Sequence, residues 1–114
     1  MSDDRLPAHL EVSGLIRSVQ AAGGFAAVLH KGERDAGTII VAVTESGRNS
    51  RAYERMPQAD GSRKWYRLKV QDPENPLEFS EYLDRRARQD GDVWVVELDI
   101  ADGERFIGEI AIAG

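Results

Sequence analysis

The residues best suited to acid–base chemistry lie in one short segment. His30 is followed closely by Glu33 and Asp35. An imidazole beside a carboxylate can act as an acid–base pair, because histidine titrates near neutral pH. A hydrogen-bonded surface histidine at a strand end is the commoner arrangement. The chain has two histidines and no cysteine, so no zinc or catalytic metal cluster is expected. An enzyme or small-molecule-binding domain built on these three residues is the alternative hypothesis.

A second group of residues joins cations to aromatic rings. It occupies alternate positions of two consecutive predicted strands: Arg51, Tyr53, Arg55, Trp65, Arg67 and Lys69. Side chains two residues apart share one face of a strand. Cations and rings on one sheet face can follow a phosphate backbone and stack bases. The alternative is a solvated or helix-covered face on which arginine packs against tyrosine and tryptophan.

The segment RRARQDGD (85–92) resembles two kinds of site and fits neither. Three arginines could hold a phosphate, and Asp90-Gly91-Asp92 could begin a calcium loop. An EF-hand loop needs an oxygen donor at position 5 and glycine at position 6. Counting from Asp90, those positions are Trp94 and Val95. Arginines suit the last turn of a helix, where the macrodipole favours positive charge, so we interpret the segment as a helix end.

Hydrophobic periodicity predicts two helices. The first covers about 7–22, with an apolar stripe at a 3.6-residue period and Gly23-Gly24 after it. The second follows Asn75, a predicted N-cap, with Pro76 at the first helical position and Glu78 completing a capping box.

Five strands are predicted between and after these helices, over 25–30, 38–44, 50–56, 65–70 and 93–100. Residues 38–44 are apolar on both faces, which indicates a strand buried on both sides. Trp94 is expected in the core. Short loops between the first four strands favour an antiparallel meander, with a turn over 57–62. Asp102-Gly103 predicts a hairpin that returns as a sixth edge strand over about 104–112.

Length and composition indicate one globular domain. The chain has 114 residues, of which 41% are hydrophobic and 31% charged. Its net charge of −5 argues against nonspecific coating of nucleic acid. The start, MSDDRLP, does not resemble a signal peptide, and no apolar run is long enough for a membrane helix. We therefore expect a cytoplasmic protein that holds no cofactor and binds no membrane.

Three stretches resemble a family of small bacterial proteins defined only as a domain of unknown function. They are AGGFAAVLHKGERDAGTIIV, DGSRKWYRL and EYLDRRARQDGDVWVVELD. The most specific element is Asp90-x-Asp92-Val93-Trp94-Val95-Val96-Glu97, and Asp35-Ala36-Gly37 matches the turn between the family's first two strands. The resemblance covers about residues 10–100. It implies one compact α+β domain and brings no activity, cofactor or catalytic residue with it.

The sequence thus predicts an α+β fold in the order helix, four antiparallel strands, helix, strand, with both helices on one side of the sheet. The preferred function is a non-enzymatic binding module whose basic-aromatic hairpin meets an anionic partner. That partner would be an acidic protein surface or single-stranded nucleic acid. A homodimer that pairs through the C-terminal edge strand is a third hypothesis.

Overall fold

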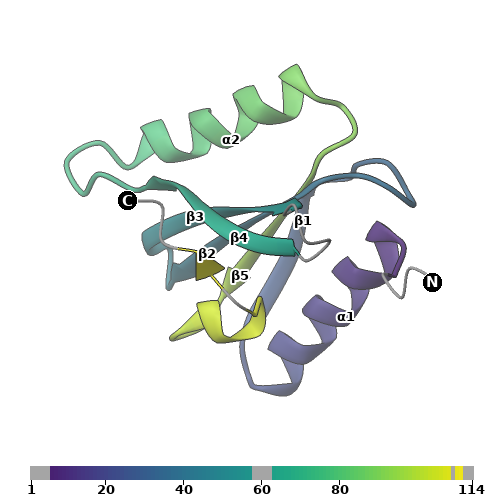
Figure 1. Ribbon diagram of the computed structural model, residues 1–114. Helices are drawn as coiled ribbons and strands as arrows, with labels where there is room; N and C mark the ends of the chain where they lie inside the picture. Colours follow the sequence, from purple (N-terminus) through teal and green to yellow (C-terminus); the bar gives the residue numbers. More distant parts are fainter. Residues whose placement is uncertain (1–5, 58–62, 109, 112–114) are drawn as a thin grey trace.

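The computed structural model describes residues 6–57, 63–108 and 110–111 of the chain, and the order of its elements is that of an α+β domain (Figure 1). The elements are α1 (Ala8–Ala21), β1 (Phe25–His30), β2 (Ile39–Glu45), β3 (Arg48–Pro57), β4 (Arg63–Val70), α2 (Leu77–Gln89), β5 (Trp94–Asp99), the 3-10 helix η1 (Gly103–Phe106) and β6 (Ile110–Ala111). Each predicted helix and strand is present, so the α+β class is confirmed. In the described part of the chain, no helix is long and apolar enough to cross a membrane.

The sheet has the strand order β1-β5-β2-β3-β4-β6, which differs from the predicted meander. Strands β2, β3 and β4 do form an antiparallel meander. However, β5 inserts between β1 and β2, antiparallel to β1 and parallel to β2. The physical reason is that β5 is apolar on both faces, since Val95 and Val96 are both at most 1% exposed. Such a strand is most stable in the middle of a sheet, and β1 is displaced to the edge.

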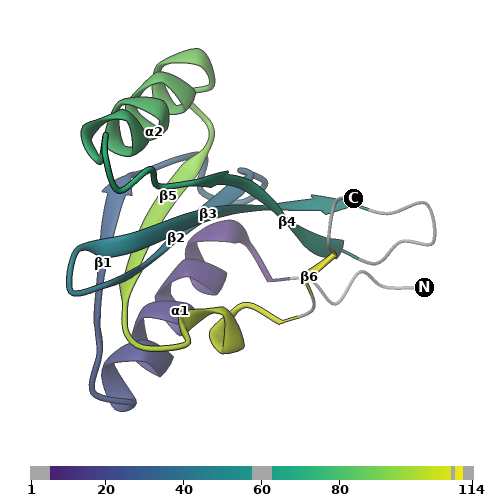
Figure 2. The ribbon, with the colours of Figure 1, turned by 90° about the vertical axis from the view of Figure 1, so that its left-hand side faces the viewer.

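The two helices lie on opposite faces of the sheet, so the prediction that both pack on one side is wrong (Figures 1 and 2). Helix α1 packs with a cluster that includes Val41, Val43 and Trp94. Helix α2 packs with a second cluster that includes Ile40 and Ala42. Successive side chains of a strand point to opposite faces. Because β2 is apolar at every position from Ile39 to Val43, each of its faces needs a covering layer.

Neither helix begins with a side-chain cap, although the sequence suggested one at α2. At α1 the loop after β1 supplies acceptors instead: the Asp35 carbonyl accepts from the Ala8 N–H at 3.0 Å and the Arg34 carbonyl accepts from the His9 N–H at 2.9 Å. These carbonyls satisfy N–H groups that have no partner within the helix. At α2 no side-chain cap forms, and the Asn75 carbonyl accepts from the Glu78 N–H at 3.2 Å. The predicted capping box is therefore absent.

The segment after β5 does not return as a hairpin. Asp102 adopts a left-handed conformation with φ of 53°, and residues 103–106 form η1 rather than a strand. A short sixth strand, β6, is present at the sheet edge, but it runs parallel to β4. The chain leaves β5 to cross the α1 face because Glu104 of η1 is anchored there by polar contacts with β3. The turn was predicted over 57–62; Pro57 is the last residue of β3, and 58–62 lies outside the described residues.

Candidate functional site

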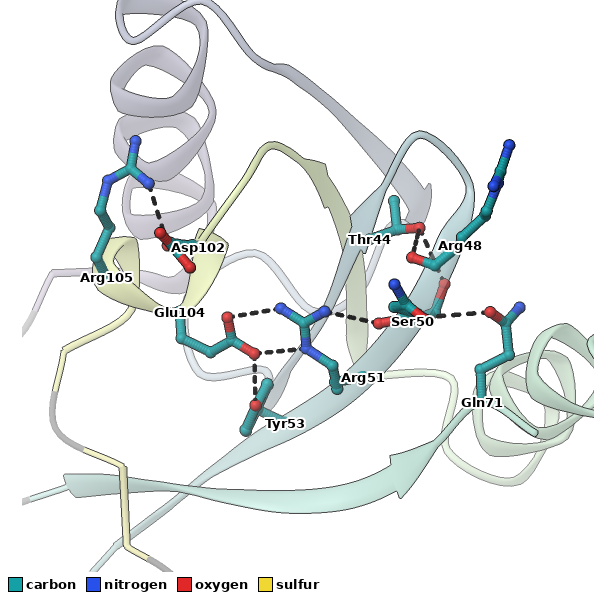
Figure 3. A network of polar contacts seen from close by, with 10 residues as sticks. Thr44, Arg48, Ser50, Arg51, Tyr53, Gln71, Asp102, Glu104 and Arg105 are labelled. Atoms are coloured by element: carbon teal, nitrogen blue, oxygen red, sulfur yellow. Dashed lines mark hydrogen bonds and ion pairs between the residues drawn. The ribbon is translucent and has the colours of Figure 1, made fainter. Parts of the chain in front are cut away.

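Most of the basic-aromatic hairpin lies beneath α1 and η1. The Arg51 guanidinium donates from Nε and Nη2 to the Glu104 carboxylate, each at 2.7 Å, and the Tyr53 hydroxyl donates to the same carboxylate at 2.7 Å (Figure 3). Tyr53 is buried. Hydrogen bonding from Arg51 is the main reason why the pKa of Glu104 falls to about 2. This cluster holds η1 against β3, and it pairs the charge of Arg51 with a carboxylate of the same chain.

The next cation and ring of the hairpin are also engaged within the protein. Arg55 forms an ion pair with Glu11 of α1. Its guanidinium also lies 5.9 Å from the centre of the buried Trp65 ring. Arginine packing on an aromatic ring beneath a helix is the alternative that the sequence left open. Arg51, Tyr53, Arg55 and Trp65 are therefore brought together, but as an interior layer.

A β-bulge separates Arg67 and Lys69, the last two residues of the basic-aromatic hairpin. Between β3 and β4 the register passes from Ala52↔Lys69 to Tyr53↔Arg67, so β4 carries one extra residue. A bulge breaks the two-residue period of side chains. Arg67 is exposed on the α1 side, whereas Lys69 contacts α2, with its Nζ 3.1 Å from the Glu78 carboxylate. The expectation that Lys69 shares a face with Arg67 is therefore wrong.

His30, Glu33 and Asp35 each have a structural contact. The Nδ1 atom of His30 lies 2.7 Å from the Val93 carbonyl, which can only accept, so Nδ1 carries the proton. The Glu33 carboxylate accepts from the backbone N–H groups of Asp35 and Ala36 and thereby closes a turn. The carbonyl of Asp35 caps α1. Within the described ranges, no three His, Asp or Glu side chains are grouped to hold a metal ion.

The loop after β1 is locked against the start of β5. The Trp94 indole N–H donates to the Glu33 carbonyl at 2.7 Å, and the Glu33 N–H donates to the Asp92 carbonyl at 2.9 Å. Gly32 and Gly37 approach the Asp92 carbonyl so closely that a Cβ atom at either position would collide with it. The motifs around Asp35-Ala36-Gly37 and Asp92-Val93-Trp94 therefore build one joint of the fold.

The arginine cluster lies at the end of α2, as the sequence indicated, and is exposed in part. Arg85 and Arg88 are exposed, and the Arg85 guanidinium lies 5.8 Å from the centre of the Tyr82 ring. Arg86 points to the sheet, where its Nη2 donates to Glu54 at 3.0 Å. In the described part of the chain, no ion pair joins Glu81 to Arg85 or Asp84 to Arg88, although each acid lies four residues before its arginine. The cluster therefore supports the helix end and its packing.

The most exposed apolar part of the sheet is its edge strand β1, which the sequence did not single out. Phe25 is 76% exposed, Leu29 51% and Val28 42%. The strand pairs on one side with β5, and its other side has no neighbouring strand in the described sheet. The backbone groups on that side are open to pairing. The signal in the sequence is that FAAVLH contains neither proline nor a charged residue.

A hollow lies beside this edge, between β1, β5 and α2. Its volume is about 260 Å³, and it is lined by Leu29, His30, Ser80, Leu83, Asp84, Ala87, Arg88 and Val95. The register of β1 against β5 shifts between Val28 and His30. A bulge at this point turns both Leu29 and His30 toward the hollow. The hollow is smaller than the clefts of ~300–1,000 Å³ that hold small-molecule ligands, and its size suits a side chain.

Two carboxylates lie on the α2 side of β5, next to the open edge. Glu97 is in register with Ala27 of β1 and with Ala42 of β2, so alanines flank it on both sides. Burial, reinforced by the nearby charge of Asp99, raises the pKa of Glu97. The Asp99 carboxylate accepts from the Ser46 N–H at 2.8 Å. Among the residues with described contacts, no cation pairs with Glu97.

Comparison with known proteins gives a consistent family assignment. The family model described as protein of unknown function (DUF1491) matches residues 6–108. A crystal structure of a DUF1491 family protein from Caulobacter crescentus CB15 is 30% identical, with a TM-score of 0.80, and the match covers 96% of this chain and 100% of that chain. An NMR structure of a DUF1491 family protein from the same organism is 32% identical, with a TM-score of 0.76 and coverage of 96% and 97%.

A solution structure of a protein from A. tumefaciens is 36% identical, with a TM-score of 0.69, and the match covers 86% of this chain and 88% of that chain. No curated protein matches the chain. The family model spans both helices and the five longer strands, so it includes the joint between the β1–β2 loop and β5 as well as the open edge. The chain belongs to the DUF1491 family.

Proposed function

We propose that this protein is a non-enzymatic, cytoplasmic binding module that takes an extended segment of a partner protein as an added strand beside β1. The observation that carries the proposal is the exposure of Phe25, Val28 and Leu29 on an edge strand with one open side. Added strands obtain affinity from main-chain hydrogen bonds and specificity from pockets for alternate side chains. Strand β1 offers the first and the hollow under α2 offers the second.

The character of β1 supports this use. Natural proteins prevent edge strands from pairing with other chains by placing lysine or proline on them or by keeping them very short. Strand β1 is six residues long and has no charged residue, whereas the opposite edge is formed by the two-residue strand β6. A strand left open and apolar is an aggregation hazard unless it has a partner.

The proposal keeps the binding module expected from the sequence and changes its surface and its partner. An anionic partner would need free cations on the hairpin, yet Arg51 is held by Glu104 and Arg55 by Glu11. Among the four cations of the predicted group, all of which the structure describes, Arg67 is the exposed one, and one exposed cation is a weak basis for recognising an acidic surface. The absence of cysteine supports the cytoplasmic part of the proposal.

Selection from a library of random nonapeptides displayed on phage tests this function. The matched variants are Leu29→Lys, at the hollow, and Leu77→Lys, at the other end of α2. Both leucines are at least half exposed, at 51% and 65%, so both variants are expected to fold. We expect enriched peptides that bind the original protein and Leu77→Lys equally and lose at least tenfold in affinity for Leu29→Lys.

Two results would contradict the proposal. One is the absence of any enriched peptide, or enrichment of peptides that bind Leu29→Lys unchanged. The other is a dimer in light scattering that Leu29→Lys converts to a monomer, because a second copy of the chain would then occupy β1.

A further inference from the structure

The α2 side of the sheet contains a row of small residues that leads inward from the open edge. The register aligns Ala27 of β1, Glu97 of β5, Ala42 of β2 and Ala52 of β3 across four strands. Ala27 is exposed, whereas Ala42 and Ala52 are buried beneath α2. Glu97 is therefore the first polar side chain in this row, and only a methyl group separates it from the edge.

A residue on the added strand opposite Ala27 can reach Glu97. Adjacent strands lie ~4.8 Å apart, so that residue would be about 10 Å from Glu97 between backbones. A lysine or arginine side chain and a glutamate side chain together span this distance above an alanine. A half-buried carboxylate with no cation beside it gains more from a counter-charge than an exposed carboxylate does, because water screens it less.

We propose that the segment bound at β1 carries a lysine or arginine opposite Ala27, paired with Glu97, and an aliphatic residue two positions away that enters the hollow under α2. The spacing follows from the strand period: positions two residues apart face the same side of the sheet. On β1 that side presents Ala27 and then the bulge of Leu29 and His30. This inference rests on the proposed function and specifies the chemistry of its partner.

The charge pattern disfavours a second copy of the chain as the occupant. Strand β1 reads FAAVLH and contains no lysine or arginine. Pairing of two β1 strands would place no cation over either Glu97, and the hollow of each copy would face an uncharged neighbour. A partner segment with a basic residue satisfies Glu97, whereas the chain's own edge strand does not.

The test is a parallel selection of random nonapeptides on phage with the original protein, with Glu97→Gln and with the control Glu81→Gln. Glu81 is exposed on α2, so its substitution changes the net charge by the same amount away from the row of alanines. Glutamine has the shape of glutamate and needs no counter-charge, so Glu97→Gln is expected to fold. We expect the original protein and Glu81→Gln to enrich peptides with lysine or arginine two residues from an aliphatic residue. For Glu97→Gln, affinity for such peptides should fall about threefold to tenfold.

The outcomes separate this inference from the function on which it rests. Peptides that need Leu29 but show no basic preference, or keep that preference on Glu97→Gln, would overturn the pairing with Glu97 and leave binding at β1 intact. Failure of all three proteins to enrich any peptide would overturn binding at β1 and this inference together.

Discussion

Replacement of Glu104 by glutamine should destabilise the protein more than its position in a short 3-10 helix suggests. The carboxylate accepts two hydrogen bonds from Arg51 and one from Tyr53, all at 2.7 Å. The Glu104 side chain is 26% exposed and that of Arg51 is 18% exposed. Hydrogen bonds to a charged group contribute ~1.5–3 kcal/mol each, but bonds that share one carboxylate are not additive. We expect Glu104→Gln to lower the free energy of unfolding by about 2–3 kcal/mol at pH 7.

The pH dependence of this loss gives a second, independent check. The pKa of Glu104 falls from its ordinary value to about 2 in the folded protein. A carboxyl with a lowered folded pKa contributes stability that is fully present above its unfolded pKa and is lost as the pH falls through the folded pKa. The difference between the original protein and Glu104→Gln should therefore be largest above pH ~5 and shrink between pH ~4.5 and 2.

Urea unfolding at pH 7 and at pH 3 measures this difference, with Glu78→Gln as the control. Glu78 pairs with Lys69 at 3.1 Å, but its side chain is 47% exposed, and exposed pairs contribute at most ~1 kcal/mol. A Glu104→Gln protein that loses no more stability than Glu78→Gln would refute the reasoning. A loss that stays constant between pH 7 and pH 3 would also refute it, because the effect would then not depend on the charge of Glu104.

Three further substitutions test other parts of the fold by the same unfolding measurement. Trp94→Ala should cost ~3–5 kcal/mol, because the ring is 4% exposed and its N–H donates to Glu33; a cost below ~1 kcal/mol would contradict its role in the joint. Gly37→Ala should lower the free energy of unfolding by ~1–3 kcal/mol through overpacking, since the new Cβ would lie 2.9 Å from Trp94 Cδ1. An unchanged urea midpoint would show that the loop shifts to accommodate the methyl group. The double substitution of Arg85 and Arg88 by glutamine should cost less than ~1 kcal/mol, and a loss of several kcal/mol would mean that these exposed side chains bridge elements.

The local structure of this chain follows from its sequence, whereas its strand order does not. Helical periodicity located α1 and α2 to within two residues, and apolar runs located β1, β2 and β5. The pairing of β1 with β5 joins residues about 70 positions apart. Hydrophobic patterns within each strand do not determine which distant strand it pairs with. The placement of the two helices on opposite faces did have a sign in the sequence. Residues 38–44 are apolar on both faces, and a strand of that kind requires a layer on each side of its sheet.

The candidate site was predicted least well, because a β-bulge and the elements that cover the sheet determine which of its side chains are exposed. The period of two placed Arg67 and Lys69 on one face, and a single extra residue in β4 separates them. The sequence offered, as the alternative to a binding face, the packing of arginine on aromatic side chains that Arg55 and Trp65 show. It did not show that Glu104 would lie above Arg51, because residues 104–112 were expected to form a strand. The open edge at β1 was missed because its exposure depends on where β5 inserts.

Amide hydrogen exchange of β1, followed by NMR in the free protein and with a selected nonapeptide bound, tests the central claim most directly. An added strand accepts hydrogen bonds from the outward-facing N–H groups of the edge strand. Those amides within Phe25–His30 should therefore exchange fast in the free protein, and their exchange rates should fall at least tenfold in the complex. If β1 exchange is unchanged while amides of β3 and β4 become protected, the peptide binds the basic-aromatic hairpin, and the claim that β1 accepts a partner strand is wrong.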